Sequence, residues 1–216
     1  MAIVDDELIK NYQKIHASKD YGFTSVIYKE HIQACINELK PKSILEFGCG
    51  QSILISSLVY DEKYYRYDPA IPEFSVIPTD KVDFIINTDV LEHIPEKDLD
   101  DVLGRMRSIS EYVFFNIATN YAKEVLPNGE NAHCTVWPGD QWLSLIRKYY
   151  PDAEIAYYVE KKACLIITWK SPGSKQLIHD IELLKVKANK KVDHIFKKIE
   201  RRLRRIRNYI LGRNRT

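Results

Sequence analysis

The chain has 216 residues, of which 45% are hydrophobic and 29% charged, a composition that fits one globular domain with an additional element. Its four cysteines lie far apart without a CxxC pair, which argues against a structural zinc site or disulfide scaffold and favours a reducing, cytoplasmic setting. The first ten residues are acidic and lack an apolar core, so no signal peptide is expected. No stretch reaches the roughly 18 apolar residues that would predict a membrane-spanning helix.

The net charge of +2 conceals an uneven distribution along the chain. From Lys175 onward there are 14 Lys or Arg and 4 Asp or Glu residues, a local net charge of +10. The 18 basic and 26 acidic residues before it give −8. We therefore expect a mildly acidic domain at 1–170, a linker at 171–175 and a basic helical tail at 176–212.

The predicted elements alternate between helices and short apolar strands. The first 40 residues favour helix, with Thr24 or Ser25 as the N-cap of a helix that ends near Pro41. Further helices are expected at 51–60, 95–109 and 139–150. Strands are expected at 43–47, 63–68, 82–89, 112–118, 154–159 and 163–169. This alternation predicts an α/β fold with a mostly parallel sheet between two layers of helices, and an antiparallel final strand pair.

The first expected strand ends in a glycine-rich turn, LEFGCGQS, at the edge of the sheet where ligands bind in such folds. Gly48 and Gly50 allow a tight turn and a close approach of the backbone to a ligand. Glu46 would repel a phosphate and suits a cationic ligand, and Ile53 stands where a dinucleotide motif has its third glycine. Asp68, 18 positions after Gly50, ends the second strand, where a carboxylate can hold a ribose diol. A purely structural turn is the alternative interpretation.

The third segment of this set is DFIINTDVLEHIP, residues 83–95, whose polar side chains should lie beside the first strand's end. Together with ILEFGCG at 44–50 and YRYDPA at 65–70, in this order and spacing, it resembles the class I S-adenosylmethionine-dependent methyltransferases. The similarity covers residues 20–170 and is greatest to the small-molecule branch that includes ubiquinone-biosynthesis O-methyltransferases.

The resemblance implies a Rossmann-like sheet of seven strands with the last pair reversed, and S-adenosylmethionine as cofactor. The glycine loop and Glu46 would hold the methionine half and Asp68 the ribose. The residues expected to bind the cofactor are Glu46, Phe47, Gly48, Gly50, Asp68 and Asn87. The chain departs from the family pattern at Gln51 and Ser52, where a further glycine is usual. The short segment between Asp68 and Asp83 predicts a rudimentary third strand and does not place the adenine contacts, for which Asp80 is only a candidate.

A sulfonium methyl donor carries its own leaving group, so the protein has mainly to align the acceptor atom, the methyl group and the sulfur. If the acceptor is a hydroxyl group, it must also lose its proton. Histidine, with an ordinary pKa near 6.5, suits that task. His133, on the long loop 126–138, is the preferred general base, and His93 is its rival. Asp89 could orient the base, bind the donor's amino group, or simply cap the turn.

Simpler roles compete with these assignments: an exposed His133, and a structural His93 at the strand–helix turn. Neighbours on the loop, Asn131 and Thr135, could orient a substrate, and Trp137 and Trp142 could floor a sugar pocket. We expect no metal, because the two histidines are far apart in the sequence and the nearby acids have other roles.

The tail carries a seven-residue apolar stripe at helical spacing, surrounded by Lys and Arg, at 190–212. Such a helix suits an anionic membrane surface, or else an acidic partner helix. Nucleic acid is not expected, since no aromatic stacking platform accompanies the charges.

These features together predict a cytoplasmic S-adenosylmethionine-dependent O-methyltransferase, peripheral at the inner face of the membrane. Its expected acceptor is a sugar hydroxyl of a lipid-linked or cell-surface glycan. The alternatives are an N- or O-methyltransferase of a quinone or other small metabolite, and a non-catalytic scaffold with the same fold.

Overall fold

The computed structural model describes residues 4–18, 24–171, 173, 175–183 and 185, and divides the chain into two units, Met1–Ile178 and His179–Thr216. The second unit is described only for a few helical residues between 179 and 185. The expected amphipathic stripe at 190–212 lies outside the described residues. Among the helices that are described, none is long and apolar enough to cross a membrane.

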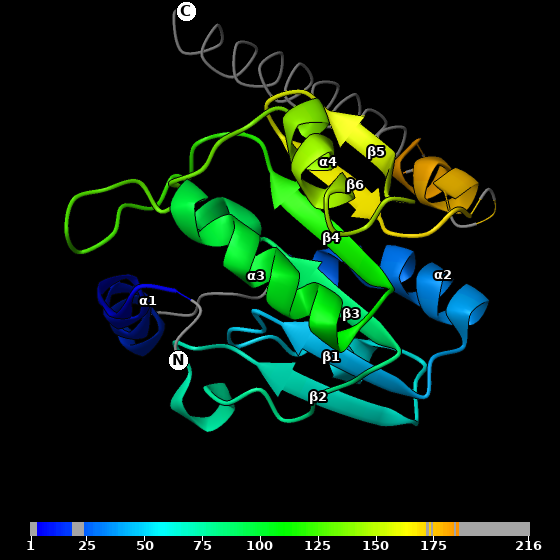
Figure 1. The fold of residues 1–216 in the computed structure, drawn as a ribbon, viewed down its shortest axis with the longest axis horizontal. Coiled ribbons are helices and arrows are strands. Elements are labelled where there is room, and N and C mark those ends of the chain that lie inside the picture. Colours follow the sequence, from blue (N-terminus) through cyan, green and yellow to red (C-terminus); the bar gives the residue numbers. More distant parts are fainter. Residues whose placement is uncertain (1–3, 19–23, 172, 174, 184, 186–216) are drawn as a thin grey trace, which may run out of the picture. The chain divides into compact units, whose positions relative to one another are not determined.

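The first unit is built on a six-stranded sheet with the order β2-β1-β3-β4-β6-β5 (Figure 1). The strands are β1 (Ser43–Phe47), β2 (Lys63–Tyr67), β3 (Phe84–Thr88), β4 (Val113–Ala118), β5 (Glu154–Val159) and β6 (Ala163–Ile167). β1 to β4 pair in parallel, and β6 runs antiparallel to both β4 and β5. The mostly parallel α/β sheet and its reversed last pair are therefore confirmed.

The expected seventh strand is wrong, and β2 is the edge of the sheet. Between β2 and β3 the chain forms a single 3-10 turn, η3 (Pro72–Phe74), and no strand among these fully described residues. Pro69, Pro72 and Pro78 divide this segment, and a proline cannot donate the backbone hydrogen bond that a paired strand requires.

The helix expected at 51–60 is also wrong, because only η2 (Leu54–Ser57) forms there as a 3-10 helix. Ile53 and Val59 are exposed, so the segment has no continuous apolar face that would hold a longer helix against the sheet. The glycine-rich turn is therefore followed by a short 3-10 helix rather than by the N-terminus of an α-helix.

The remaining helices cover the sheet or its edge. They are α1 (Asp6–Ser18), η1 (Thr24–Tyr28), α2 (Lys29–Leu39), η4 (Leu91–His93), α3 (Glu96–Ile109) and α4 (Gly139–Arg147). α3 and α4 cover one face and α2 the other, while α1 lies beyond the arrowhead ends of β1 and β2 (Figure 1). This position of α1 places it over the edge where a ligand would bind.

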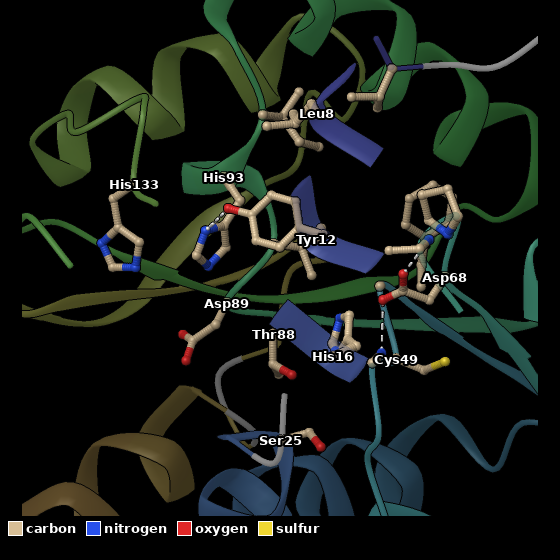
Figure 2. Close-up of a pocket in the computed structure, with 18 of the residues that line it drawn as sticks. Leu8, Tyr12, His16, Ser25, Cys49, Asp68, Thr88, Asp89, His93 and His133 are labelled. Atoms are coloured by element: carbon tan, nitrogen blue, oxygen red, sulfur yellow. Dashed lines mark hydrogen bonds between the residues drawn. The ribbon is translucent and has the colours of Figure 1, made fainter. Parts of the chain in front are cut away.

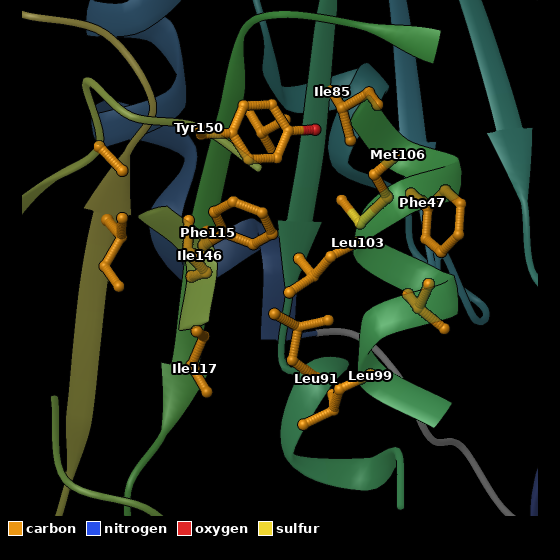
Figure 3. Close-up of a cluster of buried hydrophobic side chains, with 14 of the residues drawn as sticks. Phe47, Ile85, Leu91, Leu99, Leu103, Met106, Phe115, Ile117, Ile146 and Tyr150 are labelled. Carbon is orange, nitrogen blue, oxygen red and sulfur yellow. The ribbon is translucent and has the colours of Figure 1, made fainter. Parts of the chain in front are cut away.

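Side chains of the central strands alternate between two buried clusters, one on each face of the sheet. Ile85 and Phe115 pack with Leu103 and Met106 of α3 (Figure 3). Their neighbours on the same strands, Ile86 and Phe114, belong to the cluster under α2. This packing fixes the strands rigidly, so the loops at their carboxyl ends start from defined positions.

Candidate active site

A cavity of about 840 Å³ opens at the carboxyl ends of β1, β2 and β3. This volume lies within the range of small-molecule sites, and the position is where open α/β sheets bind ligands. One end is formed by the glycine-rich turn and Asp68, and the other by His93 and His133 (Figure 2). α1 and residues 120–124 complete the wall.

The turn after β1 adopts a conformation that depends on glycine. Gly48 and Gly50 have φ angles of +79° and +47°. A Cβ on Gly48 would lie 2.3 Å from the side chain of Val90. The N–H groups of Gly48 and Cys49 donate to the Tyr67 carbonyl, at 2.8 and 3.0 Å, so the turn is fastened to the end of β2.

Asp68 holds this turn through backbone hydrogen bonds. Its Oδ2 accepts from the Gly50 N–H at 2.8 Å, and its Oδ1 accepts from the Ala70 N–H at 2.9 Å. Each carboxylate oxygen has a second lone pair, so the carboxylate can still accept two hydroxyl groups of a ribose. Asp68 also lines the cavity.

Glu46 is a buried carboxyl group that also lines the cavity, with 2% of its surface exposed. Its Oε2 accepts from the Tyr64 hydroxyl at 2.9 Å, while its Oε1 makes no hydrogen bond to the described residues. Burial raises the pKa of Glu46. A buried oxygen without a partner fits a cationic group, such as the ammonium of S-adenosylmethionine, as its missing partner.

Phe47 lines the cavity, but Asn87 does not. The Asn87 side chain is fully buried and its amide donates to the Phe47 carbonyl at 2.9 Å. The structure thus places Asn87 behind the turn, where it joins the ends of β1 and β3. Asp80 is exposed and also lies outside the cavity lining.

Gln51 and Ser52, which replace the family's usual glycine, connect the turn to the N-terminal region. The Gln51 amide donates to the His16 carbonyl of α1 at 3.1 Å. The Ser52 hydroxyl lies 2.6 Å from that of Ser25, and both are buried. The departure from the family pattern therefore has a structural use in this chain.

The contribution of α1 to the cavity was missed by the sequence analysis. Leu8, Tyr12 and His16 line the cavity, and Ile15 packs with Leu126 and Ala132 of the long loop. The spacing of Leu8, Tyr12 and Ile15 along the sequence is that of one helical face. That signal was present, but it did not indicate which surface the face would cover.

The two histidines, distant in the sequence, meet at the far end of the cavity. Their rings lie edge to face with centroids 4.7 Å apart, so it was wrong to expect that their separation in the sequence keeps them apart in the fold. Each Nδ1 faces a backbone carbonyl: His93 Nδ1 lies 2.8 Å from Ala132 O, and His133 Nδ1 lies 2.5 Å from Asn120 O. A carbonyl oxygen only accepts, so both Nδ1 atoms carry the proton and both Nε2 atoms have a lone pair.

Tyr12 completes this arrangement from α1. Its hydroxyl donates to Ala132 O at 2.9 Å and lies 2.7 Å from His93 Nδ1. Burial, and to a lesser degree the charge of His133, lower the pKa of His93 to about 3. His93 is therefore neutral at physiological pH.

Two acids lie next to the histidines. Asp89 lines the cavity, has a φ angle of +52° and accepts a hydrogen bond from the Asn116 amide. Glu92 is fully buried, and its Oε1 accepts from the Ala118 N–H at 2.8 Å. Burial and then the charge of Asp89 raise the pKa of Glu92 well above its ordinary value. The sequence analysis gave Glu92 no role.

The other loop residues that were expected to contact a substrate make contacts within the protein instead. The Asn131 side chain bonds both the N–H and the carbonyl of Ala122, and buried Thr135 donates to the Ile94 carbonyl. Trp142 is fully buried in the core, so its expected place under a sugar is wrong, and neither it nor Trp137 lines the cavity.

Comparison with known proteins gives one family match and several similar folds. A family model described as a methyltransferase domain matches residues 26–150. The DhpI–S-adenosylhomocysteine complex is similar with a TM-score of 0.53 and 12% identity, over 76% of this chain and 97% of that chain. The small RNA methyltransferase HEN1 is similar with a TM-score of 0.52 and 14% identity, over 69% of this chain and 26% of that chain. No curated protein sequence matches. At these identities, the structural similarities establish the fold.

Proposed function

Because this chain belongs to the methyltransferase-domain family, we propose that it transfers the methyl group of S-adenosylmethionine to a hydroxyl oxygen. Family membership confirms the enzyme class that the motifs predicted, a class I S-adenosylmethionine-dependent methyltransferase. The acceptor and the methylated atom are the parts that we propose.

The cofactor fits the glycine-turn end of the cavity. Asp68 would take the ribose hydroxyls, Glu46 the cationic methionine end, and the backbone of Gly48 to Gly50 would approach the ligand closely. When bound, S-adenosylmethionine supplies an activated methyl group and its own leaving group. The chain's residues then have to position the acceptor in line and remove its proton.

One observation carries the choice of a hydroxyl acceptor, namely the two imidazoles whose Nδ1 atoms are held by carbonyls. Both rings line the cavity, and the Nε2 of each has a lone pair. A hydroxyl must lose its proton during methylation, whereas a neutral amine can attack first and lose a proton afterwards. His133 remains our preferred proton acceptor, because the low pKa of His93 makes it a weak base.

We further propose a glycan sugar as the acceptor. The polar lining residues Asn120, Lys123 and Glu124 would suit sugar hydroxyls. The basic tail, with its apolar stripe at 190–212, would hold the enzyme at an anionic membrane surface, near a lipid-linked substrate.

A quinone or similar flat metabolite is the second acceptor class. Apolar side chains from α1 and the segment after it, Leu8, Ile9 and Ile27, line the cavity and would suit an apolar ring. A partner helix in place of the membrane would then explain the tail.

The test uses purified full-length protein and methyl-labelled S-adenosylmethionine. The protein and the labelled donor are incubated separately with glycolipid, small-metabolite, protein and nucleic-acid fractions of the host. Label in glycolipid, lost on deleting residues 175–216, is the expected result. Label in the small-metabolite fraction would favour the second class, and label confined to protein or nucleic acid would overturn both.

A thermal shift with S-adenosylhomocysteine separates an enzyme from a scaffold. We expect stabilisation of the wild type and little for Asp68→Ala, because only a ligand that binds the folded state raises its stability. No stabilisation of the wild type would favour a scaffold that has lost its cofactor.

A further inference from the structure

Three side chains at the histidine end of the cavity converge in a way that the proton-acceptor role does not explain. One ligand atom from each of Glu92, His93 and His133 can be chosen so that all three lie within 4.8 Å of one another. Ligands about 2.1 Å from one ion lie roughly 3 to 4.2 Å apart, so a movement of about half an ångström would suffice. We infer that these residues form a binding site for a divalent cation.

The first support is the orientation of the two imidazoles. Metal-binding histidines usually donate their other ring N–H to a carbonyl or carboxylate, which turns the free nitrogen toward the ion. His93 does this to Ala132 O and His133 to Asn120 O. The Tyr12 hydroxyl, 2.7 Å from His93 Nδ1, adds a second contact that fixes this ring. The outer shell of a metal site is thus already in place.

The second support is independent of the histidines and comes from Glu92. Its Oε1 is fixed by the Ala118 N–H at 2.8 Å. Its Oε2 is buried and has no hydrogen-bond partner in the described part of the protein. A fully buried carboxylate oxygen without a partner is costly, and a cation would supply the missing interaction.

The ligand types restrict the ion. Two imidazole nitrogens and one carboxylate oxygen suit first-row divalent cations from Mn²⁺ to Zn²⁺, and are unlike the all-oxygen sets of Ca²⁺ sites. Three protein ligands leave positions open for oxygen atoms of a substrate or water. Asp89, bound to the Asn116 amide, adds a second carboxyl group beside the site.

This inference rests on the proposed function and deepens it, because the cation would activate the acceptor in place of an imidazole. A hydroxyl bound to the cation loses its proton to solvent buffer more readily. The resulting alkoxide forms a bond to the methyl carbon while the carbon–sulfur bond breaks. The electron pair of that bond stays on sulfur, which leaves S-adenosylhomocysteine.

The site is tested first by binding, without donor or acceptor. Metal-free full-length protein is titrated with Co²⁺ and followed by visible absorption. We expect one equivalent to bind, with affinity reduced at least tenfold in His133→Gln, and likewise in Glu92→Gln. His179→Gln and Cys134→Ser, an exposed histidine and the thiol beside His133, should bind like wild type. Absence of Co²⁺ binding, or binding unchanged in His133→Gln, would overturn the site.

His133→Gln is the decisive variant, because Glu92 is buried and its replacement can unfold the chain. S-adenosylhomocysteine affinity measures whether each variant is folded.

The catalytic role is tested by chelation. We expect chelated enzyme to lose methyl transfer and to recover it with Mn²⁺ or Co²⁺. Full transfer after chelation would overturn the role of the cation. Co²⁺ binding without methyl transfer to any fraction would instead count against the proposed function.

Discussion

The two ends of the cavity are built differently. The donor end comes from residues 46–70, two adjacent strands and their turns, and is held by backbone hydrogen bonds among near neighbours. The acceptor end joins α1, η4 and the loop at 120–133 through contacts between residues 81 and 120 positions apart. Damage at the donor end should therefore reduce donor binding as well as stability, and damage at the acceptor end should reduce transfer while donor binding is kept.

The largest effect is expected from His133→Ala. Methyl transfer should fall about 10²- to 10⁴-fold, the usual contribution of a group that activates an acceptor. S-adenosylhomocysteine affinity, measured by calorimetry, should stay within about twofold, because the donor end lies apart. His179→Ala is the control. A parallel loss of donor affinity would show that the two ends are not separable.

Gly48→Ala should produce the largest loss of stability. Its left-handed backbone and the 2.3 Å approach to Val90 together cost about 3 kcal/mol in the free energy of unfolding. Gly129 provides a matched control, with a φ angle of +89° and nothing within 4 Å of its added Cβ. Gly129→Ala should cost about 1 kcal/mol. Equal losses in urea denaturation would mean that the contact with Val90 is unimportant.

His93 should make the metal-free protein sensitive to acid. Its folded pKa of about 3 is below the ordinary value of 6.5, so the unfolded state binds a proton first as pH falls. The stability that depends on a neutral His93 is therefore complete above pH 6.5, and it is lost progressively as the pH falls from 6.5 to 3.

At pH 5 the expected loss is about 2 kcal/mol relative to pH 7.5. Glu92, whose pKa is raised, acts in the opposite sense, so the comparison is between wild type and His93→Gln, both retaining Glu92. Urea denaturation at the two pH values should show the smaller acid effect in the variant. Identical differences would rule out a buried neutral His93.

Tyr12→Phe should have the smallest effect. The Tyr12 hydroxyl holds the Ala132 carbonyl that orients His93, and about 1 kcal/mol of this orientation lost in the transition state corresponds to roughly a fivefold drop in kcat/KM. Donor affinity should not change. Tyr149→Phe, which removes a hydroxyl bound to Asp100, is the matched control. A wild-type kcat/KM in Tyr12→Phe would remove α1 from the acceptor end.

The same contrast explains what could be predicted from the sequence. The turn at Gly48 and Gly50 and the carboxylate of Asp68 depend on strand ends and short spacings, which a sequence displays directly. The meeting of Tyr12, His93 and His133 depends on where α1 and a long loop pack, which spacing does not determine. The absence of a seventh strand agrees with the short segment after Asp68, in which Pro69, Pro72 and Pro78 interrupt strand pairing.

The imidazoles are oriented by main-chain atoms of the loop, the carbonyls of Asn120 and Ala132. Side chains at these two positions can change without removing either carbonyl. Substitutions along the loop can therefore alter which acceptor fits during evolution while the activating groups keep their orientation. The choice of acceptor and the ability to activate it can thus change independently of each other in this loop.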